Sequence, residues 1–431
     1  MRKGKIRGAG VLTLRGGCAK WAGMQTETAT DETGRGAAAA FPDRRIYPPW
    51  PKRAAFLATG LAAVAARILT WPRRALGTKR RDAALVFEPF GMGDALLLQP
   101  LVRALLASGK RVAFAGNPAW APLFPVAEGF AFVPARPAWA SPDPARKYRG
   151  PVRDVLHAAR ILRPFAKGAE CIEPRGDPRA ILALWLAGAR IVRSLPLYWS
   201  ATDCRLPPFA ARFVPFDRRA TRREVSRAFA PPGVPYGRPD LAHLLGDAPR
   251  PDPKTFGLIP LTPWEGKRWP AEHWSALVEG LRARGFSPTL LCGPGEAEAA
   301  LRAVGGSRGE LAPPDSADSV CETSSLRVRE AASVADWPRL LAACGAVASV
   351  NTGPMHIADA LDVPLVVIDG ASRLPLWAPE GPRSVVLQHQ DRVPEAPFHP
   401  TASNGPRVQR AVMSLVTPDE VLAVPFLARP L

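Results

Sequence analysis

Three short segments of the chain combine glycine, hydroxyl and charged residues in an order that could handle a phosphorylated substrate. The first is Phe90-Gly91-Met92-Gly93-Asp94. Glycine permits a sharp backbone turn, and a carboxylate at the start of the following helix can face a ligand and accept a proton. The segment is therefore either a substrate-facing loop with Asp94 as a proton acceptor, or a plain glycine turn with a helix-capping aspartate.

The second segment runs from Thr262 to Pro270 and contains a hydroxyl, a lysine and the start of a helix. Backbone amides at a helix N-terminus, together with a hydroxyl and an ammonium group, suit a diphosphate. Lys267 could also neutralise the negative charge that develops on a departing nucleoside diphosphate. A surface loop with solvated charges is the alternative, but Trp264 and Trp269 would then lack packing partners.

The third segment extends from Asn351 to His356. Thr352 and Gly353 offer a hydroxyl and backbone N–H groups where a helix begins at Pro354, which is again an arrangement that binds anions. His356 would lie in the first turn of that helix. It could donate a hydrogen bond to phosphate, or it could be a structural histidine with satisfied hydrogen bonds.

Each of these segments lies between a short apolar run and a helical pattern. Short strands that alternate with helices predict an α/β fold with parallel, doubly wound sheets. We expect strands at 83–88, 111–116, 170–174, 190–195, 255–261, 289–292, 346–350 and 365–369. Helices are expected at 93–108, 178–187, 271–284, 336–344 and 353–361.

The proline-rich stretch 231–253 divides this pattern into two α/β domains, which is compatible with the length of 431 residues. We expect a leader over 1–81, an N-terminal Rossmann-like domain over 82–230, a linker over 231–253, and a C-terminal domain with a returning tail over 254–431. Because ligands bind beyond the carboxyl ends of the strands in such sheets, we expect a cleft there.

The net charge of +19 belongs mainly to the leader, since residues 1–81 hold 17 Lys/Arg against 4 Asp/Glu. No basic groove interleaved with aromatic residues follows, which argues against nucleic-acid binding. We expect residues 1–50 to be disordered. The apolar run 54–66 is too short to span a bilayer and lies too far along the chain for a signal peptide. It is either an interfacial helix, a helix packed on the enzyme body, or part of a segment upstream of the true start.

The six cysteines are scattered singly, without the spacing of a zinc or redox site, so a reducing cytoplasm fits the chain. No Asp-x-Asp pair lies at a predicted strand end to hold a metal–diphosphate complex. We therefore expect no metal site and no cofactor beyond a nucleotide-sugar substrate.

Together the three segments resemble glycosyltransferase family nine, whose best-known members are the ADP-heptose:lipopolysaccharide heptosyltransferases. The resemblance covers about 82–390 and extends to the tail at 417–423. The residues that carry it are Gly91-Met92-Gly93-Asp94, Lys267-Arg268-Trp269-Pro270, Asn351-Thr352-Gly353-Pro354-Met355-His356-Ile357-Ala358 and Pro418-Asp419-Glu420-Val421-Leu422.

The resemblance implies a GT-B fold, in which two Rossmann-like domains face each other across a cleft and the C-terminal one binds the donor. It implies metal-independent, inverting transfer from a nucleotide sugar such as ADP-heptose to lipopolysaccharide or another envelope glycan. From the scattered cysteines and the basic leader we expect a cytoplasmic enzyme, either free or peripheral on the inner face of the inner membrane. Asp94 matches the general base of the family. Gly91 and Gly93 match the loop on the acceptor side of the cleft. The implied donor-binding residues are Thr262, Lys267, Glu296, Asn351, Thr352, Gly353 and His356, with Lys267 also counted as catalytic.

Two positions depart from the family pattern. Asn351 stands where the family usually has aspartate, which removes a negative charge, and Glu88-Pro89-Phe90 replaces a basic, serine-containing run. Heptose is therefore not the only candidate sugar, and a hexose is also compatible. Two other functions stay open: a catalytically inactive, membrane-associated binding protein of the same fold, and a nucleotide-sugar epimerase. An epimerase would need a second acid/base group, and none is evident near the three loops.

Overall fold

The computed structural model describes residues 50–141, 150–198, 204–215, 217, 219–247, 250–306, 321–322, 326–370, 372, 376–389, 392 and 410–426. These form two compact units, one ending at Pro239 and the other beginning at Asp240. The boundary falls inside the stretch 231–253 that was expected to be a linker. Residues 1–49 of the expected leader lie outside the described residues.

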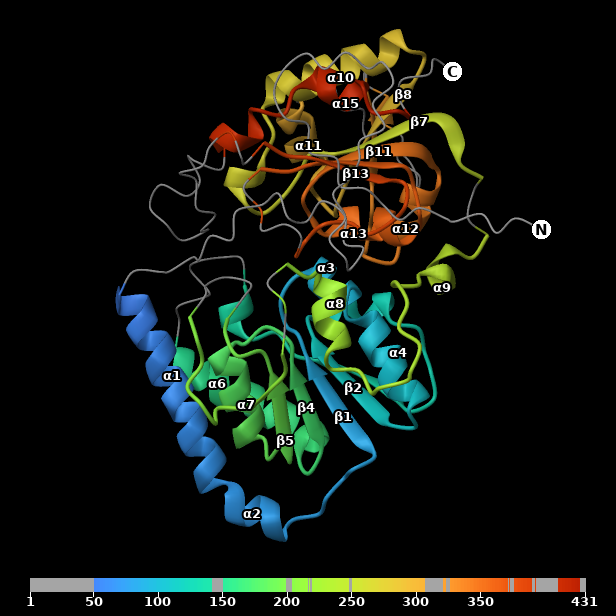
Figure 1. The fold of residues 1–431 in the computed structure, drawn as a ribbon. Helices are drawn as coiled ribbons and strands as arrows, with labels where there is room; N and C mark the ends of the chain where they lie inside the picture. Colours follow the sequence, from blue (N-terminus) through green and yellow to red (C-terminus); the bar gives the residue numbers. More distant parts are fainter. Residues whose placement is uncertain are drawn as a thin grey trace, which may run out of the picture. The chain divides into compact units, whose positions relative to one another are not determined.

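The first unit is built on a six-stranded parallel sheet with the order β3-β2-β1-β4-β5-β6 (Figure 1). All five residues of the central strand β1 are buried, because helices cover a parallel sheet on both faces. The strands are β1 (Ala83–Phe87), β2 (Arg111–Gly116), β3 (Phe130–Pro134), β4 (Glu170–Glu173), β5 (Ile191–Ser194) and β6 (Arg212–Phe213). The helices are α1 (Trp50–Leu69), α2 (Trp71–Leu76), α3 (Met92–Leu96), α4 (Gln99–Ala107), η2 (Pro118–Leu123), η3 (Ala138–Ala140), α6 (Pro151–Ala166), α7 (Pro178–Leu186) and α8 (Arg222–Arg227).

The helix expected at 93–108 is interrupted. The chain forms α3, turns at Leu97 and Leu98, and begins α4 with Pro100 in its first turn. Proline has no N–H and its ring clashes with the carbonyl four residues earlier, so it starts a helix readily and cannot continue one. The prediction of one continuous helix was therefore wrong, and the short α3 leaves Asp94 in a first turn of its own.

The apolar run 54–66 forms the middle of α1, which packs against α7. Gly60, Ala63 and Ala66 make up its buried face, and the two alanines belong to the core of the first unit. A Cβ at Gly60 would lie 2.5 Å from Pro207 Cδ, so this close approach requires glycine. Within the part of the chain that the structure describes, no helix is long and apolar enough to cross a bilayer.

The second unit contains a seven-stranded sheet with the order β13-β12-β11-β7-β8-β10-β9, parallel except for the edge pair β10–β9 (Figure 1). The strands are β7 (Asp252–Ile259), β8 (Ser287–Cys292), β9 (Cys321–Glu322), β10 (Arg327–Glu330), β11 (Cys344–Val350), β12 (Leu365–Ile368) and β13 (Ser384–Leu387). The helices are α9 (Ala242–Leu245), η4 (Glu265–Lys267), α10 (Ala271–Ala283), α11 (Ala297–Ala303), α12 (Trp337–Ala342), α13 (Gly353–Ala360) and α15 (Pro418–Leu422).

The C-terminal helix α15 packs on α10 and closes the core of the second unit. Trp269 is buried edge-on against Trp274, with ring centroids 4.9 Å apart, and its indole N–H donates to the Val416 carbonyl at 2.9 Å. Trp264 is 41% exposed. One of the two tryptophans in the second segment thus anchors its loop to the body of the unit.

Candidate functional site

Both sheets reverse their strand order at one pair of neighbouring strands. In the first unit β1 and β4 are neighbours, while β2 and β5 lie on opposite sides of them; in the second unit β11 and β7 are neighbours, flanked by β12 and β8. The loops beyond the carboxyl ends of such a pair diverge, which leaves room for a ligand. Two of the three predicted segments follow β7 and β11, and the other follows β1. The sheet topology therefore places all three at switch points.

In the first unit, Asp94 lies in the first turn of α3 with both carboxylate oxygens engaged. Oδ2 accepts a hydrogen bond from the backbone N–H of Gly91 at 3.1 Å, and Oδ1 accepts one from Arg175 Nη1 at 2.5 Å. Both side chains are largely buried. Gly91 is exposed and Gly93 is buried beneath the loop. Arg175 comes from the loop after β4, so the ion pair joins the two strands of the switch point.

A second ion pair supports the first. Glu88, fully buried after β1, accepts from Arg222 Nη2 at 2.7 Å and lies 3.5 Å from Arg175 Nη1. Burial raises the pKa of Glu88, although the two guanidinium groups oppose that shift. For Arg175 burial acts to lower the pKa, and the carboxylates of Asp94 and Glu88 outweigh it and raise the pKa. The charges of two carboxylates and two guanidinium groups thus compensate one another in a largely buried site.

The loop after β4 is shaped so that it presents Arg175. The Glu173 carboxylate accepts hydrogen bonds from the backbone N–H groups of 175–177 and from Ser194 Oγ. Burial raises the pKa of Glu173 to about 8, and the nearby Asp177 charge adds to the shift. Gly176 has a φ of +77°, and a Cβ there would lie 2.0 Å from the Leu197 carbonyl oxygen. Only glycine fits this turn.

In the second unit, Lys267 and Asn351 meet at the other switch point. Lys267 ends η4 in the loop after β7, and its Nζ donates to Asn351 Oδ1 at 3.5 Å. Asn351 follows β11 and is buried, and its Nδ2 has no hydrogen-bond partner among the described residues. Thr262 is also buried, with its Oγ1 accepting from the Trp264 N–H at 3.4 Å. A buried amide that lacks a partner costs free energy unless a ligand accepts its hydrogen bond.

The start of α13 offers further donors. Thr352 is the N-cap residue in an extended conformation, and its hydroxyl makes no capping bond to the helix. Gly353 begins the helix, and no acidic residue lies in its first turn. His356 is buried in that turn. The positive end of the helix dipole and the N–H groups of the first turn therefore remain without an acidic neighbour from α13 itself, as an anion site requires.

The structure adds one acidic residue that sequence reasoning missed. Asp369 follows β12 and is fully buried; its Oδ2 accepts from Gln388 Nε2 at 2.9 Å. Burial raises the pKa of Asp369 to about 6, and the positive charge of Lys267 opposes this shift. The sequence placed this residue at the end of a strand at 365–369. An aspartate that directly follows an apolar run of strand residues was the available signal.

The remaining predicted donor residue, Glu296, follows β8, the other neighbour of β7. It is exposed, and its Oε2 accepts from the backbone N–H of Gly293 at 2.9 Å, so the carboxylate folds back on its own loop. The structure thus joins Lys267 to Asn351 by a direct contact and leaves Glu296 on a separate loop of the same sheet edge. Sequence reasoning missed Arg175 and Arg222, because a buried arginine carries no periodic signal.

Among the described residues, no group of three His, Cys, Asp or Glu side chains is placed to hold a metal ion. The cysteines at positions 171, 204, 292 and 344 are buried and unbonded to one another. Burial is also the largest cause that raises the pKa of Cys344 to about 12. These thiols are core residues.

Comparison with known proteins finds similarity to glycosyltransferases. Residues 238–406 match Glycosyltransferase family 9 (heptosyltransferase). Lipopolysaccharide heptosyltransferase 1 of Pseudomonas aeruginosa is 29% identical over 269 residues, which cover 57% of this chain and 68% of that protein.

Solved structures share the fold at low sequence identity. Heptosyltransferase WaaC of E. coli, solved with ADP, has a TM-score of 0.54 and 17% identity, and covers 79% of this chain and 97% of WaaC. A glycosyltransferase family 9 protein from Veillonella parvula has a TM-score of 0.53 and 14% identity, with 80% and 96% covered. E. coli ADP-heptose lipopolysaccharide heptosyltransferase II has a TM-score of 0.51 and 17% identity, with 79% and 96% covered.

These similarities confirm the GT-B fold expected from the sequence, with a Rossmann-like sheet in each unit. The matched span 238–406 contains both loops that meet at the second switch point. The loops, the fold and the sequence similarity thus agree, and residues 238–406 of the chain match glycosyltransferase family nine, the heptosyltransferase family.

Proposed function

We propose that this enzyme transfers heptose or a hexose from a nucleoside-diphosphate donor to lipopolysaccharide or a related envelope glycan, with inversion at the anomeric carbon. The observation that carries the proposal is the buried Asn351 amide without a partner, beside Lys267 and at the start of α13. ADP-heptose is the first donor to test, because relatives named as heptosyltransferases include one solved with ADP.

The donor diphosphate would bind at the second switch point. Lys267 supplies a positive charge, Asn351 Nδ2 an uncommitted donor, and the first turn of α13 its backbone N–H groups. Thr352 and His356 lie in the same turn and would add donors. The same groups would stabilise the charge that accumulates on the diphosphate as the sugar leaves. Glu296 would contact the ribose only after leaving Gly293, so its role is the least supported of the donor residues.

The acceptor hydroxyl would be activated by Asp94. The pairing with Arg175 fixes the orientation of this carboxylate, while each carboxylate oxygen has a further lone pair. In an inverting displacement Asp94 would take the hydroxyl proton as the oxygen attacks the anomeric carbon and the nucleoside diphosphate departs. Gly91 and Gly93 would let the loop approach the acceptor closely. We place this reaction at the cytoplasmic face of the inner membrane, where such an acceptor is assembled.

The test is a donor screen followed by a transfer assay. Thermal shift with a panel of nucleoside-diphosphate sugars identifies the donor, since a ligand at about 100 times its Kd adds about 2.7 kcal/mol of stability. The donor that stabilises the protein is then incubated with and without deep-truncated lipopolysaccharide. We expect release of nucleoside diphosphate that depends on the acceptor, and a product in which the anomeric configuration is inverted.

The other outcomes separate the alternatives. Donor binding without turnover, with or without acceptor, would identify a binding protein of the same fold. Conversion of the donor sugar to an epimer in the absence of acceptor would identify an epimerase. Retention of anomeric configuration in the product would contradict single displacement with Asp94 as the base.

A further inference from the structure

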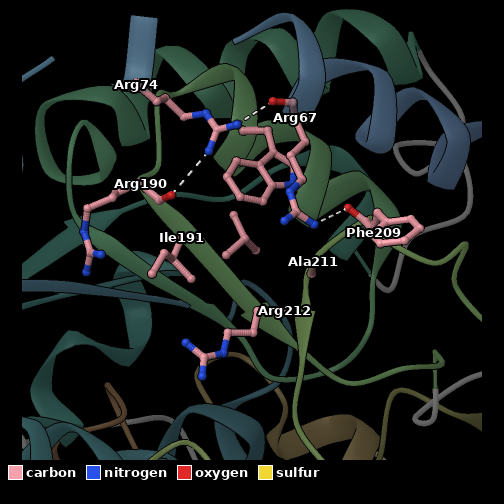
Figure 2. Close-up of a pocket in the computed structure, with 9 residues that line it drawn as sticks. Arg67, Arg74, Arg190, Ile191, Phe209, Ala211 and Arg212 are labelled. Carbon is pink, nitrogen blue, oxygen red and sulfur yellow. Dashed lines mark hydrogen bonds between the residues drawn. The ribbon is translucent and has the colours of Figure 1, made fainter. Parts of the chain in front are cut away.

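The first unit has a second polar site, at the opposite edge of its sheet from Asp94. A pocket of about 380 Å³ is lined by four arginines, with the indole of Trp185 at its wall (Figure 2). Arg190 directly precedes β5 and Arg212 begins β6, so the pocket lies at the amino ends of these parallel strands. The candidate catalytic residues lie beyond the carboxyl ends. The pocket therefore has no part in the chemistry proposed above.

The four arginines are not paired with acids. Within the described residues, none of Arg67, Arg74, Arg190 and Arg212 lies within ion-pair distance of a carboxylate, and Arg190 Nε is buried without a hydrogen-bond partner. Burial lowers the pKa of Arg74, and the charge of Arg67 adds to that effect. Like charges gathered in a half-buried pocket repel one another unless an anion binds between them.

The pocket is nevertheless held rigidly. Arg74 Nη1 donates to the Arg190 carbonyl at 3.3 Å, and Arg67 Nη1 donates to the Phe209 carbonyl at 2.6 Å (Figure 2). Both guanidinium groups stack on Trp185, with Arg74 4.6 Å from the ring centroid. Each guanidinium group has five N–H donors, so these few hydrogen bonds to backbone carbonyls leave several donors available for a ligand. The site is thus organised before any ligand arrives.

The helix that supplies Arg67 also carries an exposed apolar face. Trp50, Leu57, Leu61 and Ile68 are all exposed, and spacings of seven and four residues align them along one side of α1. The opposite side is the one that packs on α7 through small residues. Leu69 at the end of α1 is also exposed, as are Trp71 and Leu76 in α2.

An exposed aromatic residue sits at the rim of the pocket. Phe209 is 74% exposed and has a φ of +68°, a left-handed conformation that is strained for an aromatic residue. Its carbonyl is the acceptor for Arg67. Strain of this kind persists where the surrounding structure enforces it, and such positions cluster at binding sites. Here it presents a phenyl ring to solvent beside a cluster of positive charge.

We infer that α1, α2 and this arginine pocket dock on a membrane surface, with the phosphate of an anionic phospholipid headgroup bound in the pocket. An anionic phospholipid satisfies both features together, since its phosphate matches the guanidinium groups and its acyl region accepts the apolar side chains. Charge complementarity selects this occupant over a second copy of the chain, whose own pocket would bring further arginines. The helix lies in the interface and does not cross it, in agreement with its composition.

Vesicle sedimentation of the full-length protein tests the inference. Phosphatidylcholine vesicles with and without phosphatidylglycerol are compared for the wild type, the pocket variant Arg190→Gln/Arg212→Gln, and the stripe variant Leu61→Gln/Ile68→Gln. We expect the wild type to prefer phosphatidylglycerol vesicles. Each arginine near an anionic surface adds to the free energy of binding. The pocket variant loses two of them, so its affinity for phosphatidylglycerol vesicles should fall about 30-fold. The stripe variant should weaken binding to both kinds of vesicle.

Matched controls lose the same charge or apolar surface elsewhere. Arg136→Gln/Arg282→Gln removes two exposed arginines outside the pocket, and Val126→Gln/Val152→Gln removes two exposed valines outside the stripe. Both should bind like the wild type, and circular dichroism melts check that every variant is folded. If the arginine control weakens binding as much as the pocket variant, attraction is general and the pocket is not a site.

Two further outcomes would overturn the inference. If the wild type binds soluble glycerol phosphate with the same affinity as it binds vesicles, the pocket is a site for a free phosphate. A dimer in sedimentation velocity that the stripe variant abolishes, without vesicle binding by the wild type, would assign the stripe to a second copy. Donor binding by thermal shift is measured in parallel, so failure here is distinguishable from failure of the proposed transferase activity.

Discussion

The two switch points of this enzyme are built from similar loops and hold their charges in opposite ways. At the first, Asp94 and Glu88 are paired with Arg175 and Arg222, and the partners are largely buried. At the second, Lys267 faces the neutral Asn351, whose amide nitrogen is buried without a partner. The first site is electrostatically complete, whereas the second has binding capacity that a ligand can use.

This difference is the one expected of a positioning site and a ligand site. A carboxylate that must act as a base benefits from a fixed orientation, and a network of ion pairs supplies it. A diphosphate site must instead keep donors uncommitted until the ligand arrives, at some cost in stability. The substitutions below test whether the two regions differ in this way.

The largest effect is expected at the first site. Asp94→Asn keeps the shape of the side chain and removes the proton acceptor, so transfer should fall by about 10²–10⁴-fold. Donor affinity, measured by calorimetry, should stay within a factor of two, because Asp94 belongs to the other unit's loop. A transfer rate within threefold of the wild type would eliminate Asp94 as the base.

Arg222→Met should be the most destabilising change at the same site. It leaves Glu88 buried with its nearest guanidinium 3.5 Å away, and breaking a buried ion pair costs about 3–5 kcal/mol. Denaturant unfolding gives the free energy of unfolding directly. The double variant Glu88→Gln/Arg222→Met is the control and should recover much of the loss. A cost below about 1 kcal/mol for the single variant would mean that this pair does not stabilise the loop.

At the second site, Lys267→Ala should weaken donor affinity and slow transfer together, each by about 10- to 100-fold. The reason is that a charge-assisted hydrogen bond to phosphate, worth about 1.5–3 kcal/mol, is lost in both the ground state and the transition state. The neighbouring exposed Arg268 provides the matched control as Arg268→Ala. Equal donor affinity in both variants would show that Lys267 does not contact the donor.

A smaller effect concerns pH. The pKa of Asp369 is raised from 3.8 to about 6, so the folded protein keeps this proton over a range where the unfolded chain has lost it. Its contribution to stability therefore falls as pH rises from about 4 to 6. A bound diphosphate near the same lysine would favour the protonated form, so donor affinity should also fall several-fold as pH rises through about 6.

Asp369→Asn isolates this contribution because it keeps the size of the side chain and cannot titrate. Donor affinity of the variant should be flat between pH 5 and 7.5 after correction for the donor's own phosphate titration. If the wild type and the variant show the same pH profile, the charge of Asp369 is not coupled to the donor.

The smallest effect should come from metal removal. We expect a chelator to leave the transfer rate within about twofold, because Lys267 and the start of α13 would supply the positive charge that a metal supplies elsewhere. Loss of turnover in the chelator, with recovery on adding magnesium or manganese, would assign that task to a metal ion.

Although β3, β13 and α6 were not predicted, the sequence by itself determined the central strands of both sheets and the three candidate loops. Both follow from local rules: apolar runs of strand length, helical spacing of apolar residues, and the turn preferences of glycine and proline. The strand at 111–116 appears with the predicted bounds, and the helix expected at 271–284 differs by one residue. The resemblance to family nine rested on the order of motifs, which the sequence displays directly.

Tertiary structure alone decided which charges meet. Arg175 and Arg222 lie 47 positions apart and on different loops, and only the packing of β1, β4 and α8 brings both to Glu88. The sequence also could not determine which face of α1 is buried, because the largely apolar run in this helix has no clear hydrophobic periodicity. The side of α1 that contains Gly60 is buried and the side that contains Leu61 is exposed, because α1 packs against α7 and the loop at Pro207. Contacts between distant segments depend on how the units pack, and no local sequence preference encodes them.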